Sequence, residues 1–196
     1  VIGQDYEQLI EGGCGLTCGN HVFGSTTGEE FLVNLTSEYA GLSNSFVVVA
    51  THPEYYDGEI PWLTTSELKD NFVTETKYHI TEDGLKNSSA KKIPPNSTII
   101  AMYGATIGKT CINTIEMTTN QACCVFTPKK ENSVDPYFLQ QILIYFRPLI
   151  VSLAEGSGQP NISQDFLKKF KIPFPSTYLE QQKIALILFN IDELIR

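Results

Sequence analysis

The side chains of this sequence best suited to chemistry at a surface are neutral hydrogen-bonding groups at the ends of short apolar runs. Thr64 and Thr65 follow one such run, and Asn120 and Gln121 precede another. Hydroxyls and amides both donate and accept hydrogen bonds, so they can read the edges of another molecule. A hydroxyl becomes a nucleophile only beside an activating base, and no motif around these residues supplies one. The pattern favours recognition over bond-making.

The patterns that suggest catalysis are incomplete. Gly104 and Gly108, followed by Lys109, are similar to a phosphate-binding loop, but three residues separate the glycines where that loop needs four. The residues after Lys109 have a strand pattern, so no helix N-terminus is available to bind phosphate. The histidines stand outside any nucleophile-elbow motif, and no acidic pair suits magnesium-dependent cleavage. We expect no catalytic residue, no cofactor and a glycine-tightened turn at 104–109.

The cysteines indicate neither a metal site nor a disulfide scaffold. Cys14, Cys18 and His21 offer three potential zinc ligands, but a structural site needs four, and His52 would have to be recruited. The total of five cysteines is odd, and Cys123 and Cys124 are adjacent, which is typical of reduced cytoplasmic thiols. No apolar run reaches the length of a membrane span, and no leader-like segment opens the chain. We expect a cytoplasmic protein without a metal and without membrane contact.

Charge is unevenly distributed along the chain. Residues 1–60 hold nine acidic residues and no Lys or Arg, whereas the whole chain has a net charge of −8. An acidic total argues against a nucleic-acid partner, although local basic clusters decide the contact face. Nine lysines could neutralise phosphates, or could be solvated surface residues: Lys86, Lys91, Lys92, Lys109, Lys129, Lys130, Lys168, Lys169 and Lys171.

The pattern of elements predicts an α+β (mixed α/β) domain over residues 53–175, with residues 1–52 as a poorly assigned acidic segment of the same globule. Asp135 followed by Pro136 predicts a helix start, and Pro148 should end or kink that helix. Ser163 should cap a short helix through Lys168. The other expected elements are strands at 98–103, 106–112, 121–127 and 170–174, a turn at 56–58, and one helical turn at 81–85 stopped by Gly84.

A last helix is predicted over residues 176–196. Thr177 and Glu180 have the spacing of a capping box. The residues Ile184, Leu188, Ile191 and Ile195 then step by four, three and four, which is the seam of a coiled coil with a partner helix. The same stripe could instead pack on the chain's own domain, and the sequence supports both interpretations equally.

Seven segments in series resemble the target recognition domain of type I restriction–modification specificity subunits. Their order and spacing are similar across residues 53–196, and several independent segments together are far more specific than any one. These segments are residues 53–62, 84–90, 102–109, 118–122, 156–163, 171–175 and 181–185.

The resemblance implies a single DNA target recognition domain that reads about half of a split target in double-stranded DNA. It also implies a long helix that leads to a second such domain. Catalysis would belong to partner methyltransferase (M) and restriction (R) subunits. In this interpretation Tyr103 and Lys109 flank a turn near the DNA, Lys91 and Lys92 face phosphates, and Thr64, Thr65, Asn120 and Gln121 read bases. Asn120 and Gln121 could equally be strand-edge caps.

Two features depart from the family pattern. Residues 1–52 lack a recognisable opening strand and helix, and only one recognition domain is present where a whole subunit has two. The chain could be a half-subunit that pairs with a second copy, a fragment, or a recombination cassette. Two other functions stay open: a protein-interaction module whose acidic first sixty residues face a basic partner, and the recognition part of a fused restriction–methylation enzyme. The enzyme would need a methyltransferase motif, and the order of Ile93, Pro94, Pro95 and Asn96 does not match one.

Overall fold

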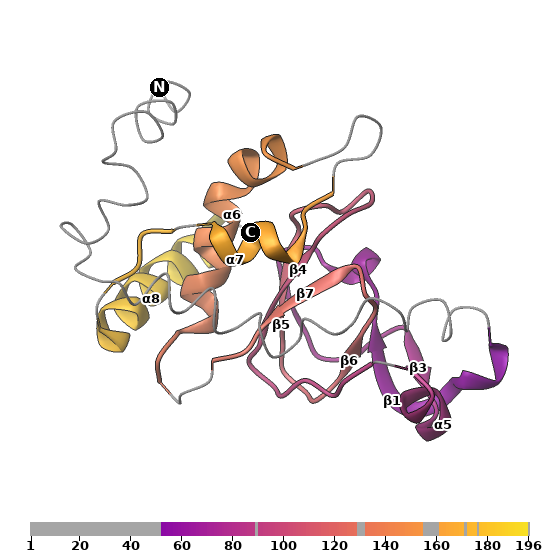
Figure 1. Ribbon diagram of the computed structural model, residues 1–196. Coiled ribbons are helices and arrows are strands. Elements are labelled where there is room, and N and C mark those ends of the chain that lie inside the picture. The colour runs from indigo at the N-terminus through magenta and orange to yellow at the C-terminus, as the bar shows by residue number, and fades with distance from the viewer. Residues whose placement is uncertain are drawn as a thin grey trace.

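The computed structural model describes residues 52–88, 90–128, 132–154, 161–170, 172–175 and 177–195. Predictions that fall on residues 1–51, including the Cys14, Cys18 and His21 set, lie outside these residues. Two small mixed sheets and a layer of helices confirm the α+β class (Figure 1). The elements are η2 (Pro53–Tyr55), β1 (Tyr56–Leu63), η3 (Thr65–Glu67), β2 (Asn71–Val73), β3 (Tyr78–Ile80), α5 (Glu82–Lys86), β4 (Thr98–Ala101), β5 (Thr110–Asn113), β6 (Thr118–Thr119), β7 (Cys123–Phe126), α6 (Pro136–Ser152), α7 (Gln164–Lys169) and α8 (Tyr178–Ile195).

The first sheet has the order β3-β1-β6, with β1 antiparallel to β3 and parallel to β6. The expected turn at 56–58 is a bulge inside β1, between Tyr56 and Ile60. Asp57 there has a φ of 59°, and a Cβ on Gly58 would come within 2.3 Å of the Ile80 carbonyl oxygen. Only glycine allows this close approach of the two strands.

The second sheet has the order β2-β5-β4-β7. Its buried residues alternate between two cores, as strand geometry requires. Ile99 and Ala101 of β4 face one cluster with Leu63 of β1 and with Met117, which precedes β6. Ile100 faces the other cluster, which the helices complete. The four-stranded sheet therefore lies between the first sheet and the helices (Figure 1).

Helix α6 begins as predicted, because the Asp135 side chain accepts a hydrogen bond from the Phe138 amide at 2.8 Å. It does not end at Pro148 but continues to Ser152. Phe146 and Ile150, on either side of the proline, are both buried in the same core. Their packing offsets the backbone hydrogen bond that proline removes. Ser163 caps α7 as predicted, by accepting from the Phe166 amide.

Two other expectations need correction. Gly84 does not stop α5, which runs to Lys86; the glycine instead lets the helix approach Tyr55, whose Cβ would lie 2.9 Å from a Cβ at position 84. Among the described residues of 170–174 there is no strand. The alternating residues Phe170 and Phe174 are buried, but they pack on helix α6 through Phe146 and Phe138.

Candidate functional site

The parallel strands β1 and β6 end side by side, and this brings together residues that are far apart in the sequence. Leu63 pairs with Thr119, and the Asn120 amide donates to the Leu63 carbonyl at 3.0 Å. Thr64 therefore follows one strand end where Asn120 follows the other. Parallel pairing places corresponding strand ends at the same edge of a sheet.

The strand ends of the second sheet meet the same edge. The Met102 amide donates to the Ala122 carbonyl at 2.7 Å, which places Tyr103 beside the 120–122 turn. Lys109 lies opposite Ala101, the last residue of β4, because its carbonyl accepts a hydrogen bond from the Ala101 amide at 2.8 Å. We call the set Thr64, Thr65, Tyr103, Lys109, Asn120 and Gln121 the polar edge.

The two amides of the polar edge differ in environment. Asn120 is only 7% exposed, and its Oδ1 accepts a hydrogen bond from the Cys123 thiol at 3.3 Å. Gln121 is half-buried, and its shielded Oε1 has no hydrogen-bond partner. An unpaired buried acceptor costs about 1–3 kcal/mol. Turning that side chain outward to a ligand would remove the cost.

The hydroxyl end of the edge is held by Glu67. One carboxylate oxygen of Glu67 accepts from both the amide and the hydroxyl of Thr64 at 2.9 Å. The other accepts from the Lys77 amide at 2.8 Å, which closes the loop after β2. Thr65 begins η3 and is half-buried. Glu67 therefore fixes the place of Thr64, and Thr65 follows it in the chain.

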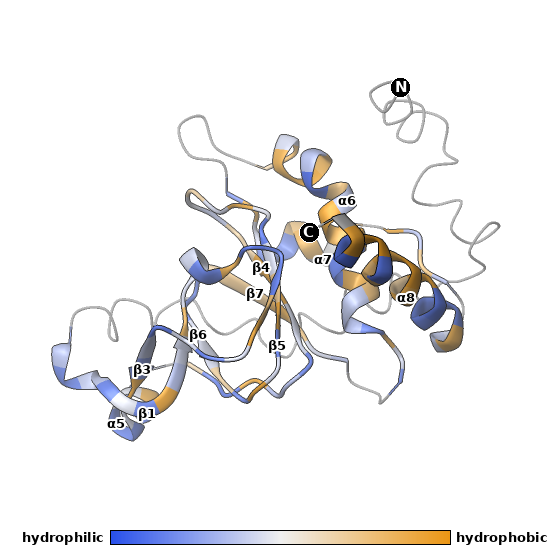
Figure 2. Cartoon of the chain, turned by 180° about the vertical axis from the view of Figure 1, so that it is seen from behind, coloured by the Kyte–Doolittle hydropathy of each residue, from blue (hydrophilic) through white to orange (hydrophobic). Residues whose placement is uncertain are grey.

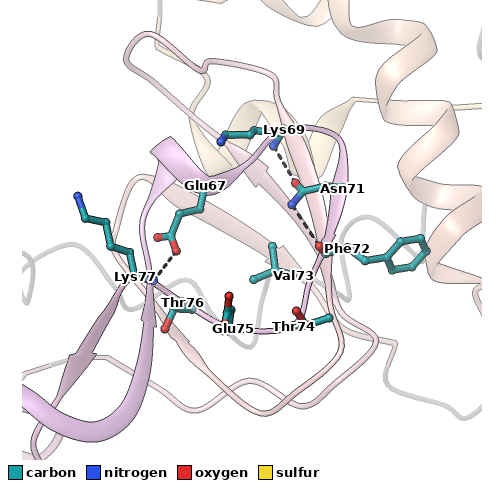
Figure 3. A pocket seen from close by; sticks show the side chains of 9 residues that line it. All are labelled: Glu67, Lys69, Asn71, Phe72, Val73, Thr74, Glu75, Thr76 and Lys77. Carbon is teal, nitrogen blue, oxygen red and sulfur yellow. Dashed lines mark hydrogen bonds between the residues drawn. The ribbon is translucent and has the colours of Figure 1, made fainter. Parts of the chain in front are cut away.

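The loop closed by Glu67 borders a shallow pocket of about 380 Å³ (Figure 3). Acidic, basic and uncharged side chains all line this pocket. Glu67 points toward Lys77 there, and the Phe72 ring points away from the pocket. The lining residues of the pocket are Glu67, Lys69, Asn71, Phe72, Val73, Thr74, Glu75, Thr76 and Lys77.

Lys109 is not an independent cation. Its Nζ donates to Asp70 at 2.9 Å, and the Asp70 carboxylate also accepts from Arg147 and from the amide and hydroxyl of Thr110. Arg147 donates from Nε to the Gly108 carbonyl at 2.8 Å. Burial raises the pKa of Asp70, but the hydrogen bonds from Lys109 and Thr110 and the charge of Arg147 outweigh it, so the pKa lies below its ordinary value.

Asp70 and Arg147 were missed from the sequence. Asp70 is three residues from Glu67 in an ordinary polar loop, and nothing in its local pattern indicates its partners. Arg147 did carry a signal, because it is the lone charge in the apolar stretch of residues 138–153. A charge on a buried helix face generally has a partner, since an unpaired buried charge is costly.

Lys91 and Lys92 lie elsewhere. Ile93 bridges to Met117, which precedes β6, so these lysines are at the strand end opposite to Asn120. Lys92 approaches Glu116 at 3.7 Å and Glu82 at 4.0 Å. Six of the eight selected residues thus meet at the polar edge, and these two do not.

The residues of the predicted helix seam do not all lie on one surface: some face the domain and others face outward. Ile184 packs against the domain's own core, and Leu188 is half-buried. Ile191 is 46% exposed, and the Ile195 side chain is not among those that the structure describes. Figure 2 shows hydrophobic residues along α8. The large apolar residues exposed on this helix are Leu179, Leu186, Ile187, Phe189, Ile191 and Leu194.

Helix α8 is fixed to the domain by polar contacts. Gln181 is 2% exposed; its Oε1 accepts from the Asp135 amide at 2.8 Å, and its Nε2 donates to the Ser133 carbonyl. Asp192 accepts from the Tyr137 hydroxyl at 2.7 Å and from Gln141 at 3.1 Å. Packing on its own domain is thus observed for one side of the helix.

Reactive groups are scarce in the part of the chain that the structure describes. Burial raises the pKa of the Cys111 and Cys123 thiols well above their ordinary value, so both stay protonated. Within residues 52–195, gaps excepted, no group of three or more His, Cys, Asp or Glu could hold a metal ion. None of the described helices is long and apolar enough to cross a membrane. The fold and the site together define a mixed α/β domain whose polar edge is suited to hydrogen bonding.

The chain belongs to the family of type I restriction modification DNA specificity domains, whose family model matches residues 49–196. It is 33% identical over 150 residues to the type I restriction enzyme MjaIX specificity subunit of Methanocaldococcus jannaschii, with 72% of this chain and 33% of that protein covered. The EcoR124I/EcoR124II specificity subunit of Escherichia coli is 29% identical over 142 residues, covering 70% of this chain and 35% of that protein. This chain therefore spans about a third of the length of both curated relatives.

Solved structures share the fold. The HsdS subunit from Thermoanaerobacter tengcongensis superimposes with a TM-score of 0.54 at 18% identity, covering 73% of this chain and 33% of that one. The S subunit of a type I system from M. genitalium gives a TM-score of 0.51 at 21% identity, covering 72% of this chain and 34% of that one. The family resemblance inferred from the sequence motifs is confirmed.

Proposed function

We propose that this chain recognises sequence in double-stranded DNA for a type I restriction–modification system, as a half-subunit or as part of a longer specificity subunit. The observation that carries the proposal is the polar edge, where residues selected for hydrogen-bonding chemistry converge from the strand ends of both sheets. Neutral amides and hydroxyls are the groups that discriminate base edges in a DNA groove. The family model, a DNA specificity domain, agrees with this role.

In this proposal the chain itself transfers no methyl group and cuts no DNA. A methyltransferase subunit and a restriction subunit would carry those reactions, in the cytoplasm. The exposed apolar residues of α8, Leu186 and Ile187 among them, supply a surface for a partner helix. A second recognition domain or a second copy of this chain would provide that helix, since the chain spans only a third of its curated relatives.

Selection from a random duplex pool tests the function. The full chain, together with any subunits that co-purify with it, is incubated with the pool, and the retained DNA is sequenced. We expect enrichment of one short defined sequence. Retention of all duplexes alike at moderate salt would contradict the proposal, because phosphate contacts alone carry no sequence information.

A further inference from the structure

We propose that Asp70 sets the balance between sequence-specific and non-specific DNA binding, by neutralising Lys109 and Arg147 and by fixing the turn that follows Tyr103. The inference rests on the proposed function and assigns a positioning role to a residue outside the polar edge. It is carried by the hydrogen bonds of one carboxylate, which join three segments of the fold.

The first observation is that both carboxylate oxygens of Asp70 accept hydrogen bonds. Its Oδ1 accepts from the amide and the hydroxyl of Thr110, both at 3.1 Å, and from Arg147, while its Oδ2 accepts from Lys109 at 2.9 Å. The backbone at Asp70 has a φ of 61°, a left-handed conformation uncommon outside glycine, asparagine and aspartate. The Asp70 amide also donates to the Thr110 carbonyl at 2.8 Å. The residue is held firmly at the start of β2.

The second observation is that the same cluster holds the 104–108 turn. Arg147 donates to the Gly108 carbonyl, and Gly108 has a φ of 76°. A Cβ at Gly108 would lie 2.9 Å from the Arg147 Cγ, so the arginine packs directly on the turn. Arg147 of helix α6 thereby links the turn after Tyr103 to Asp70. A base-reading side chain needs such a rigid support to discriminate.

The third observation is the balance of charge. One carboxylate faces two cations, whose side chains are 43% (Lys109) and 21% (Arg147) exposed. A lysine held by a carboxylate attracts phosphate less than an unpaired one, and the other two N–H donors of Lys109 stay available. Without the negative charge at position 70, both cations would attract any phosphate. Non-specific binding, which is mainly electrostatic, would strengthen.

Asp70→Asn tests this, because asparagine keeps the size of the side chain and removes its charge. The probes are the duplex enriched by the full chain and a scrambled duplex of the same composition, each titrated at several salt concentrations. We expect tighter binding of the scrambled duplex and a log–log salt slope steeper by about 0.9 for each additional phosphate that the variant neutralises. Discrimination between the duplexes should fall about tenfold, the effect of one mismatched base pair.

Glu116→Gln is the matched control, because it removes the same charge from the Lys92 pair at the far strand end. It should leave slope and discrimination unchanged. Adding Lys109→Gln to Asp70→Asn should reverse the steeper slope. A purely structural role for Asp70 would instead weaken binding to both duplexes without a steeper slope, and that result would overturn the inference. An equal rise in scrambled-duplex binding for Glu116→Gln would overturn it too, since net charge alone would then explain the effect.

If Asp70→Asn proves unfolded by circular dichroism, Arg147→Gln provides the second test. It keeps Asp70 but releases the turn, so discrimination should fall while binding of the scrambled duplex does not strengthen. Full discrimination in Arg147→Gln would overturn the inference. A wild-type chain that enriches no sequence would instead refute the proposed function itself.

Discussion

At the residue scale, Asn120 and Gln121 are adjacent in sequence but differ in what they can contribute. Asn120 is nearly buried and bonded to Cys123, so much of its amide maintains the turn into β7. Gln121 has a buried oxygen without a partner. A hydrogen bond to a DNA base would therefore stabilise Gln121 more than Asn120, whose oxygen already has a partner.

We predict that Gln121→Ala changes sequence preference and leaves thermal stability nearly intact. The lost amide–base contact is worth about 1–3 kcal/mol of discrimination. Asn120→Ala, in comparison, should lower the free energy of unfolding by about 1 kcal/mol, because it removes a buried hydrogen bond. Sequencing of selected duplexes and thermal melts measure both effects. Unaltered preference in Gln121→Ala would refute its base-reading role.

The Asp70 carboxylate should also make stability depend on pH. Its pKa is lowered in the folded protein, from an ordinary 3.8. The stabilisation by its ion pairs is therefore fully present above about pH 5 and is lost as the pH falls through the lowered pKa. We predict that Asp70→Asn is less stable than wild type at pH 7 and that the difference shrinks toward pH 3 in denaturant titrations. A difference that stays constant over this range would contradict the assignment.

At the element scale, the turn between β4 and β5 illustrates what the sequence could predict. Two glycines separated by three residues indicated a tight turn, and both have positive φ: 85° at Gly104 and 76° at Gly108. Its support was not predictable, because Arg147 is 39 residues away from Gly108 and no local pattern relates them. Similarly, the burial of Phe170 and Phe174 was predictable from alternation, but the choice of a helix over a sheet as their partner was not.

Gly108→Ala tests the support of this turn. The added methyl would need an unfavourable φ and would press on Arg147. We predict a loss of about 1–2 kcal/mol in the free energy of unfolding. Gly104→Ala serves as the comparison, since nothing lies within 4 Å of its Cβ position and only the φ strain remains. Equal losses in the two variants would show that contact with Arg147 does not matter.

Helix α8 shows a second limit of sequence analysis. The spacing of Ile184, Leu188, Ile191 and Ile195 predicted a stripe, but spacing alone could not say which side meets the domain. Ile184 packs inward, whereas Leu186 and Ile187 are each 60% exposed. The polar anchors Gln181 and Asp192 set this rotation of the helix, and neither had been recognised as an anchor.

We predict that Leu186→Asp with Ile187→Asp prevents assembly with partner subunits while the chain stays folded, because both side chains face outward. Ile184→Asp is the contrasting variant and should destabilise the domain by placing a charge against its core. Size-exclusion chromatography with circular dichroism separates the two effects. An unchanged complex in the double variant would exclude this face as the partner surface.

At the scale of the whole molecule, the residues that form the cores and the residues of the polar edge lie in different parts of the fold. The four-stranded sheet is buried between two cores, and the polar edge lies where its strands and those of the first sheet end. The α+β class was predictable from the order of the motifs, and the polar side chains at strand ends were recognisable because that pattern is local. Lys91 and Lys92 were grouped with the edge on charge alone, and only the topology separates them from it.

The central claim is that neutral side chains at the polar edge select a DNA sequence. It is tested most directly by sequencing the duplexes that the full chain, with its co-purifying subunits, retains from a random pool at physiological ionic strength, about 0.15 M. We predict one enriched sequence for the wild type and a different preference for Gln121→Ala. Uniform retention by the wild-type protein would contradict the account.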